Sequence, residues 1–287
     1  MTFPDFIIIG AMKCGTSTLA AQLGLQTGIF ITTPKEPNFF SDDVVHAKGV
    51  AWYSSLFDAA APCDLKGEAS THYTKLLTHP DAAARMAQTI KDPKLIYMIR
   101  DPIARLVSHY IHEWSMEEMK GSLVEALDTH PELVDYSLYG RQLAPYVAQY
   151  GQDRILVVRL EDMQVAPQQT LEHVCRFLGY DSRPLWRSEY ARENASAERI
   201  RRFPLHDLVF DNPLATTLRR ALVPQALRDR IKQARQMRTR PTLPTESRRA
   251  LEARFTADLE TLLSLFPDRP DLAKSYPFAD ALASSAK

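Results

Sequence analysis

The feature that most constrains the fold is a short apolar run near the amino terminus that leads into a glycine-containing loop. Residues Phe6–Ile9 are apolar, the loop runs from Gly10 to Gly15, and Thr16 opens a hydroxyl-rich stretch with helical spacing. This pattern predicts a buried strand, a tight loop and a helix. Such a unit points backbone N–H groups, and the positive end of the helix dipole, into the crevice beyond the strand. We therefore expect an anion to bind there.

A second stretch follows the same plan further along the chain. Leu95–Ile99 is an apolar run that predicts a buried strand, and residues 103–119 have the spacing of a helix. Between them, Asp101 suits the N-cap of that helix and Pro102 suits its first position. We therefore expect another unit of strand, turn and helix.

A third unit begins with the apolar run Ile155–Val158, which also predicts a buried strand. The chain then crosses Glu161 and Asp162 and enters a helix near Pro167. Gly179 suits the end of that helix, because glycine adopts the left-handed conformation that closes many helices.

Apolar strands that alternate with amphipathic helices indicate an α/β fold with a central parallel sheet flanked by helices. Segments 80–91 and 137–150 predict further helices. A chain of 287 residues, 45% of them hydrophobic, can bury one large core. We expect a single domain over residues 1–287, with a phosphate-binding core at about 1–180 and a helical, Arg-rich tail at about 181–280.

The overall charge gives no reason to expect a nucleic acid or an acidic polymer as partner. Lys plus Arg and Asp plus Glu both number 35, so the net charge is zero. The distribution is uneven, because residues 199–254 hold fourteen Arg or Lys and five Asp or Glu. Solvated helix faces and an anion-facing surface both explain this basic segment.

The cysteines and the hydropathy pattern bear on location. Cys14, Cys63 and Cys175 lack metal-ligand spacing, and their odd number argues against a disulfide framework. We interpret Cys14 as a small filler of the loop rather than as a redox group. No apolar run reaches the roughly twenty residues that a spanning helix needs. The sequence therefore predicts no transmembrane segment and a reducing, cytoplasmic location.

The loop after the first strand carries the strongest chemical signal. Lys13 supplies a full positive charge, Gly15 allows close backbone approach, and the following hydroxyls add donors. These hydroxyls belong to Thr16, Ser17 and Thr18. A small-residue turn without a ligand would explain the glycines but not a lysine beside three hydroxyls. We expect a phosphate group at this loop.

The loop departs from the G-x-x-x-x-G-K-[ST] pattern of nucleotide triphosphatases. Lys13 lies two residues before Gly15, and Thr16 stands where that pattern has lysine. A lysine placed this early can reach the bridging oxygen of a 5'-phosphate donor. The adjacent Lys-Ser/Thr pair that serves β- and γ-phosphates with magnesium is absent from the loop.

Four segments in order resemble the PAPS-dependent sulfotransferases, particularly the heparan sulfate sulfotransferases and their bacterial relatives. PAPS is 3'-phosphoadenosine 5'-phosphosulfate. Together the segments span most of residues 5–180. They are residues 10–18, Lys35-Glu-Pro-Asn-Phe-Phe40, Arg100-Asp-Pro with Ser108 and Tyr110, and Leu160-Glu-Asp-Met ahead of Phe177-Leu-Gly179.

The resemblance implies a P-loop-like sulfotransferase fold and PAPS as co-substrate, with no metal required. It places Arg100 and Ser108 at the positions that hold the 3'-phosphate in the family. An arginine fork and a helix hydroxyl suit that role physically, because both make charge-assisted contacts to phosphate. Taken alone, Arg100 could instead pair with Asp101 or Glu161. The residues around Lys13 would hold the 5'-phosphosulfate end.

The same resemblance makes Glu36 the candidate catalytic base. Pro37 keeps Glu36 out of helical geometry, so its carboxylate can face a crevice and take a proton from the acceptor. Lys35 could contact the transferring sulfonate. His109 and His112 are rival bases, since some family members use histidine.

Two features depart from the heparan-type pattern. Those enzymes carry a lysine soon after the glutamate of a Gly-Glu segment, whereas the segment from Gly67 to Tyr73 has none. This speaks against recognition of a highly sulfated polysaccharide. The adenine-side loop also lacks a clear basic-glycine motif. Candidates for closing over the donor are Arg192, Arg199, Arg201 and Arg202.

The sequence therefore predicts a sulfotransferase that modifies a hydroxyl or amine of a carbohydrate, lipid or small molecule. The acceptor pocket would be built from loops within residues 40–75, 110–145 and 185–245. A phosphate-loop kinase and a non-catalytic adenosine-phosphate binding module remain alternatives. The prediction depends on one spatial condition, namely that Lys13 and Arg100 lie close enough to hold the two phosphate groups of one adenosine.

Overall fold

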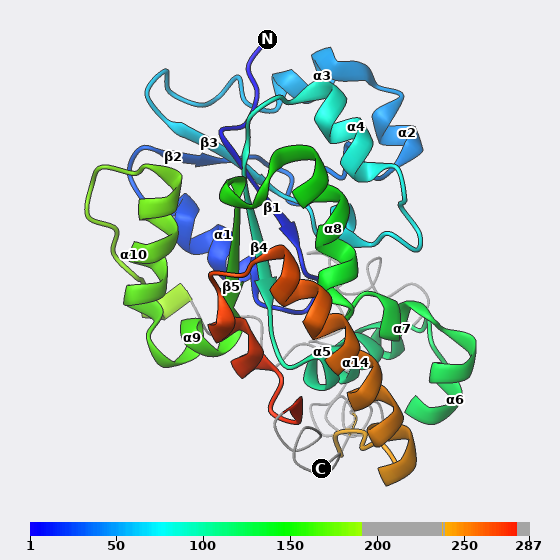
Figure 1. Cartoon of the computed structure of the whole chain (residues 1–287). Helices are drawn as coiled ribbons and strands as arrows, with labels where there is room; N and C mark the ends of the chain where they lie inside the picture. The colour runs from blue at the N-terminus through cyan, green and yellow to red at the C-terminus, as the bar shows by residue number, and fades with distance from the viewer. Residues whose placement is uncertain (191–236, 238, 280–287) are drawn as a thin grey trace, which may run out of the picture.

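A computed structural model of the chain describes residues 1–190, 237 and 239–279. Its centre is one parallel sheet of five strands in the order β2-β3-β1-β4-β5 (Figure 1). This confirms the predicted α/β class with a central parallel sheet. The strands are β1 (Phe6–Gly10), β2 (Ile29–Ile31), β3 (Leu65–Ala69), β4 (Lys94–Ile99) and β5 (Ile155–Arg159).

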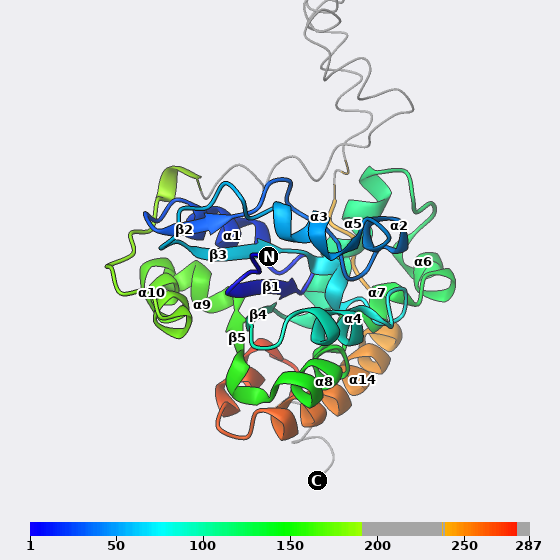
Figure 2. The same cartoon turned by 90° about the horizontal axis from the view of Figure 1, so that it is seen from above.

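Helices cover both faces of the sheet, as seen from above in Figure 2. α1 (Thr16–Gly24) and α10 (Pro167–Leu178) lie on one face, and α4 (Ala82–Thr89) and α8 (Tyr139–Tyr150) lie on the other. The other described helices are α2 (Asp43–His46), α3 (Gly49–Ser55), α5 (Pro102–Ser115), α6 (Leu123–Thr129), α7 (Glu132–Asp135), α9 (Leu160–Val165) and α14 (Thr245–Leu265), with 3₁₀ turns η1 (Thr71–Thr74), η2 (Gln152–Arg154), η3 (Ser188–Tyr190) and η5 (Pro270–Ser275).

The three strands predicted from apolar runs are β1, β4 and β5. Every residue of β1 and all but the first of β4 are buried, as expected for inner strands of a sheet covered on both faces. The prediction of Asp101 as N-cap is confirmed, because its Oδ1 accepts the backbone N–H groups of Ile103 and Ala104. The predicted crossing at Glu161 and Asp162 is instead the short helix α9.

Two strands, β2 and β3, were not predicted from the sequence. β2 is an apolar run of only three residues, Ile-Phe-Ile, and β3 has the sequence Leu-Lys-Gly-Glu-Ala. Glu68 of β3 is fully buried, because its carboxylate accepts hydrogen bonds from the Tyr53 and Tyr73 hydroxyls at 2.7 and 2.9 Å. A carboxylate satisfied in this way occupies an inner strand position that a hydropathy pattern assigns to a loop.

The sheet order places the site. β1 lies between β3 and β4, so the chain leaves β1 toward one edge and returns to the other side of β1 as β4. Ligands of open α/β sheets bind beyond the carboxyl ends of the strands at such a reversal. The loops after β1 and β4 therefore meet at one crevice. These are the loops that carry Lys13 and Arg100.

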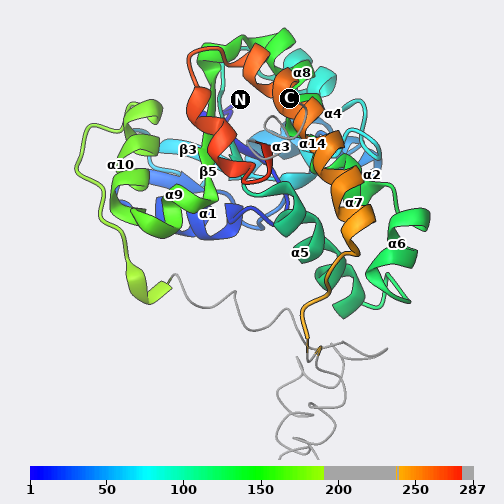
Figure 3. The same cartoon turned by 60° about the horizontal axis from the view of Figure 1, so that its bottom comes forward.

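The long helix α14 packs along α8, and the segment that follows it lies against β5 (Figure 3). Asp258 of α14 caps the start of α8, accepting the backbone N–H groups of Gly140 and Arg141 at 2.8 and 2.9 Å. The two backbones approach so closely that a Cβ on Gly140 would lie 2.7 Å from both Asp258 O and Leu262 N. Only glycine fits this crossing.

Replacing Gly140 with alanine should destabilise the protein. The new Cβ meets backbone atoms of α14 that cannot swing aside, and overpacking of this kind costs about 2 kcal/mol or more. Gly24→Ala is the matched control, because a Cβ there is no nearer than 3.5 Å to Ile31. Denaturant unfolding should show a lower midpoint for Gly140→Ala and an equal or higher one for Gly24→Ala. Equal midpoints for wild type and Gly140→Ala would contradict the close crossing.

Candidate functional site

A cavity of about 510 Å³ opens where the carboxyl ends of the strands converge. Every strand of the sheet contributes to it, because the lining residues follow β1, β2, β3, β4 and β5 in turn. All eight predicted site residues line this one cavity, although they come from three separate parts of the sequence. They are Lys13, Gly15, Thr16, Ser17, Thr18, Glu36, Arg100 and Ser108.

The loop after β1 delivers the start of α1 to the cavity. Gly15 is the N-cap of α1, so it offers no side chain of its own to the first amides of the helix. Those amides have no partner within the helix and carry the positive end of its dipole. Gly15 has φ +88°, and a Cβ would lie 2.8 Å from Leu160 and 2.9 Å from Met163. The conformation favours glycine here, and a Cβ would also displace the ends of these two side chains.

Two arginines hold this loop through its backbone carbonyls. Fully buried Arg105 donates from Nε to Met12 O at 3.2 Å, and Arg100 donates from Nη1 to Lys13 O at 3.2 Å. Cys14 is also fully buried, and burial raises the pKa of its thiol to about 11. This agrees with the interpretation of Cys14 as a small loop filler. The Gly10–Gly15 loop is therefore held by hydrogen bonds to its carbonyls.

The Arg100 turn meets the Gly10–Gly15 loop directly. Arg100 Nη1 donates to the Lys13 backbone carbonyl, and both residues line one cavity, so the two loops adjoin. The Glu161 carboxylate instead accepts the Asp101 backbone N–H, through Oε1 at 2.9 Å. Ser108 lies two turns along α5 and is half-buried. Arg100 and Ser108 therefore present an arginine fork and a hydroxyl to the same space.

Glu36 faces these donors from the loop after β2. Its carboxylate accepts the backbone N–H of Thr71 at 3.0 Å, the Thr71 hydroxyl at 3.0 and 3.2 Å, and the Lys35 ammonium at 3.1 Å. Burial raises the pKa of Glu36, but the Lys35 charge and the Lys35 and Thr71 hydrogen bonds outweigh it, so the net pKa is lowered. Glu36 is therefore ionised at neutral pH. Lys35 also donates to the hydroxyl of Ser17, the second residue of α1, at 3.2 Å.

A buried network behind Glu36 holds its loop. Asn38 donates its backbone N–H to Ser70 Oγ at 3.1 Å, and that hydroxyl donates to Glu68 Oε2 at 3.3 Å. Burial raises the pKa of Glu68 to about 7, although its hydrogen-bonding neighbours oppose this effect. The ring of Phe39 in the same loop stacks on Tyr53, with the ring centroids 4.6 Å apart. Tyr53 and Tyr73 are both fully buried core residues.

Sequence reasoning missed three lining residues that follow β3, namely Thr71, His72 and Lys75. Burial lowers the pKa of Lys75 to about 8 and that of His72 to about 4. Lys75 brings a lysine to the cavity although the segment from Gly67 to Tyr73 has none. A prediction of β3 would have revealed all three residues, because its carboxyl end lies at the same edge as the others.

The two candidate histidines of α5 lie in different surroundings. His109 is buried, with Nδ1 3.0 Å from Arg105 Nη2 and Nε2 3.3 Å from Glu113 Oε1. Burial and then the Arg105 charge lower the pKa of His109 to about 3. Both ring nitrogens are thus engaged inside the protein. His112 lines the cavity and is the rival to Glu36 that the geometry retains.

Some sequence expectations fall elsewhere. The arginines considered for closing over the donor, from Arg192 to Arg202, lie outside the described residues. Within residues 1–190 and 239–279, no three His, Cys, Asp or Glu side chains are grouped to hold a metal ion. No helix in that same part of the chain combines the length and apolar character needed to cross a bilayer.

The arrangement joins two chemical functions across one space. On one side are the α1 amides, Lys13 and Arg100, which suit a ligand with two anionic groups. On the other side is Glu36, an ionised carboxylate that can take a proton from a bound molecule. An acceptor between the two sides would meet His72, Lys75 and His112.

Comparisons with known proteins agree with this geometry. A family model described as a sulfotransferase domain matches residues 3–209. Heparan sulfate glucosamine 3-O-sulfotransferase 3B1 of Mus musculus is 30% identical over 186 residues, which cover 61% of this chain and 46% of that protein. Membrane-associated sulfotransferase kil1 of Dictyostelium discoideum is 34% identical over 113 residues, covering 38% of this chain and 23% of that protein. This chain thus matches less than half the length of either relative.

A solved structure shows the same arrangement of elements. The crystal structure of a sulfotransferase from Alicyclobacillus acidocaldarius superposes with a TM-score of 0.57 and 28% sequence identity. The superposition covers 66% of this chain and 89% of that one. The resemblance seen in four short segments is thus matched by a structural likeness over two thirds of the chain. The chain belongs to the sulfotransferase family.

Proposed function

We propose that this protein transfers a sulfuryl group from PAPS to a hydroxyl or amine of a carbohydrate, lipid or small-molecule acceptor. The observation that carries the proposal is the shared cavity, in which two adjoining anion-binding groups face an ionised carboxylate. Neither group alone would favour this reaction over simple phosphate binding. Membership of the sulfotransferase family gives independent support.

In this proposal the two anion-binding groups hold the two phosphate-bearing positions of one ribose. Lys13, Gly15 and the hydroxyls of residues 16–18 bind the 5'-phosphosulfate, and Arg100 with Ser108 binds the 3'-phosphate. The bond from Arg100 to the Lys13 carbonyl supports this division, because it keeps the two groups adjacent. The donor set of amides, hydroxyls, one ammonium and one guanidinium fits a bisphosphorylated adenosine.

The residues around the cavity supply the chemistry by position and charge. PAPS, when bound, supplies the sulfuryl group and the phosphate leaving group. Glu36 accepts the acceptor's proton as the acceptor attacks, and Lys13 stabilises the negative charge on the departing 5'-phosphate. Lys35 lies between Ser17 and Glu36, where it can contact the transferring sulfonate. We propose that no metal takes part.

The acceptor side of the cavity is basic and polar. His72, Lys75 and His112 line the same cavity as Glu36, and they fall within the ranges 40–75 and 110–145 predicted for the acceptor pocket. Lys75 offers a cation to an acidic or polar acceptor despite the missing Gly-Glu lysine. The mouse relative is named for glucosamine units of heparan sulfate. A hydroxylated sugar is accordingly the first acceptor class to test.

The organisation and the location of the chain stay proposals. We propose a single domain, because α14 packs on α8 and the residues after it bond to β5. A reducing, cytoplasmic compartment is supported by the cysteines, all three of which are free thiols.

Two measurements on the purified full chain test the proposed function. Calorimetry should show binding of adenosine 3',5'-bisphosphate, the desulfated product, in preference to ATP with magnesium. Incubation with ³⁵S-labelled PAPS and fractions of a cell extract should then label an acceptor, equally with and without EDTA. Preferred binding of ATP with magnesium would point to a kinase, and bisphosphate binding without transfer to any fraction would point to a binding module. Either result would overturn the proposal.

A further inference from the structure

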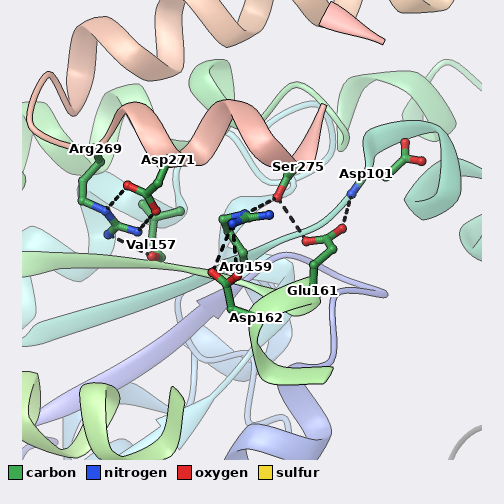
Figure 4. A network of polar contacts seen from close by, with 8 residues as sticks. All are labelled: Asp101, Val157, Arg159, Glu161, Asp162, Arg269, Asp271 and Ser275. Carbon is green, nitrogen blue, oxygen red and sulfur yellow. Dashed lines mark hydrogen bonds and ion pairs between the residues drawn. The ribbon is translucent and has the colours of Figure 1, made fainter. Parts of the chain in front are cut away.

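Both polar atoms of one peptide unit, the unit between Arg100 and Asp101, are held by distant side chains. The Tyr139 hydroxyl donates to Arg100 O at 3.0 Å. The N–H of the same peptide unit, Asp101 N, donates to Glu161 Oε1 at 2.9 Å (Figure 4). Tyr139 and Glu161 therefore clamp this peptide unit from both sides, through these two hydrogen bonds. The clamp fixes the peptide plane on the carboxyl side of the Arg100 Cα.

Tyr139 connects the clamp to the Gly10–Gly15 loop. It is the first residue of α8 and is fully buried. Its hydroxyl also lies 3.6 Å from Cys14 Sγ, and because the hydroxyl proton goes to Arg100 O, the Cys14 thiol is the donor there. One hydroxyl thus touches both loops that carry the proposed phosphate sites. Any shift of Tyr139 would move the two loops relative to each other.

Glu161 is held by a chain of polar contacts that reaches the C-terminal part of the protein (Figure 4). Its other oxygen, Oε2, accepts the Ser275 hydroxyl at 3.1 Å. Ser275 is buried, and its oxygen accepts Arg159 Nε at 3.1 Å. Arg159 in turn pairs with Asp162, with the charged groups 3.1 Å apart. Glu161 therefore cannot turn away without breaking contacts on both of its oxygens.

A second contact holds the same C-terminal segment in place. Arg269 donates from Nη1 to Val157 O at 3.2 Å and pairs through two 2.8 Å bonds with Asp271. This fixes the residues around η5 against β5, as Figure 4 shows. The Ser275 hydroxyl is thereby positioned to support Glu161.

The direction of an arginine side chain follows from the backbone that bears it. If the peptide unit after Arg100 shifts, the Arg100 Cα shifts with it, and the guanidinium at the end of the side chain is displaced. A displacement of about 1 Å at a binding group can cost about 10²-fold in rate or affinity. Neither Tyr139 nor Glu161 is among the residues that line the cavity. Their effect on a ligand would therefore act through Arg100.

We propose that Tyr139 and Glu161 are positioning residues that aim Arg100, and that they set the preference of this site for a 3'-phosphorylated nucleotide. This inference rests on the proposed function, because it assigns the 3'-phosphate to Arg100. The clamp does not contact the donor. Its effect is on the share of the nucleotide-binding free energy that the 3'-phosphate contributes.

The test compares two nucleotides that differ only in the 3'-phosphate, adenosine 3',5'-bisphosphate and adenosine 5'-monophosphate. Wild type should bind the bisphosphate about 10²-fold more tightly, which is typical of charge-assisted phosphate contacts. Tyr139→Phe and Glu161→Ala should each reduce this ratio about tenfold, mainly by weakening bisphosphate binding. Glu161→Gln should keep the ratio within about threefold of wild type, because its amide oxygen can still accept the Asp101 N–H.

Tyr150→Phe is the matched control for lost stability. Tyr150 lies on the same helix, α8, and its hydroxyl also donates to a backbone carbonyl, that of Ile90, at 3.1 Å. This variant should leave the nucleotide ratio unchanged. An unchanged ratio in folded Tyr139→Phe and Glu161→Ala would overturn the clamp while leaving the proposed function intact. Wild type without any preference for the bisphosphate would instead overturn the proposed function itself.

Discussion

Replacing Glu36 with glutamine should lower the turnover number about 10²–10⁴-fold, the usual contribution of a positioned general base. Glutamine has the same shape and can still accept the Thr71 hydrogen bonds, so the loop should keep its conformation. It cannot take a proton. Binding of adenosine 3',5'-bisphosphate should therefore stay within about threefold of wild type, while transfer of labelled sulfate falls.

Two further variants show whether a loss of turnover is specific to Glu36. Glu260→Gln alters an exposed glutamate on α14 and should leave turnover unchanged. His112→Asn removes the rival base that also lines the cavity. A large loss of turnover in His112→Asn, with full activity in Glu36→Gln, would assign the base to histidine and contradict the role of Glu36.

The pH profile distinguishes the same two bases. The pKa of Glu36 is lowered, so its carboxylate persists to more acidic pH than that of an ordinary glutamate. If Glu36 is the base, kcat/KM should hold to more acidic pH than an ordinary glutamate base would allow. A histidine base would lose activity at less acidic pH, because imidazole takes up its proton nearer neutrality than a carboxylate does. Circular dichroism at each pH should confirm that the protein stays folded.

The second large effect is expected at Lys13. Lys13→Ala should lower the turnover number about 10²–10³-fold, because the charge that develops on the leaving phosphate loses its cation. Alanine retains a Cβ at a backbone position with φ 69°, so the change removes charge without adding the freedom of glycine. Weaker binding of the bisphosphate should accompany the loss.

Two control variants show whether the loss of turnover depends on the position and the shape of the Lys13 charge. Lys91→Ala removes an exposed lysine before β4 and should have no effect on turnover. Lys13→Arg should recover only part of the activity, because the flat guanidinium does not replace a compact ammonium in a tight loop. Wild-type turnover in Lys13→Ala would remove Lys13 from the proposed mechanism.

The sequence predicted those strands and helix ends that depend only on residues close together in the chain. β1 and β4 read as apolar runs because both faces of each strand are covered. Asp101 and Pro102 marked the start of α5, since capping depends on neighbours within three residues. β3 was missed because Lys66 and Glu68 interrupt it, and the reason Glu68 can be buried lies in Tyr53 and Tyr73.

The candidate site divides in the same way. Lys13, Glu36 and Arg100 were predicted because they belong to short motifs with recognisable spacing. Lys75 was missed, because its place in the cavity depends on where β3 ends. The inward face of α5 was also unreadable, and only packing decides that His109 is enclosed while His112 lines the cavity.

The parallel course of all five strands has a practical consequence for handling the protein. Since the cavity lies at the carboxyl edge of the sheet, the amino edge carries none of its residues. Met1 lies just before β1 at that amino edge and is 86% exposed (Figure 1). A tether attached at Met1 would hold each molecule on a solid support with its opening turned outward, accessible even to polymeric acceptors.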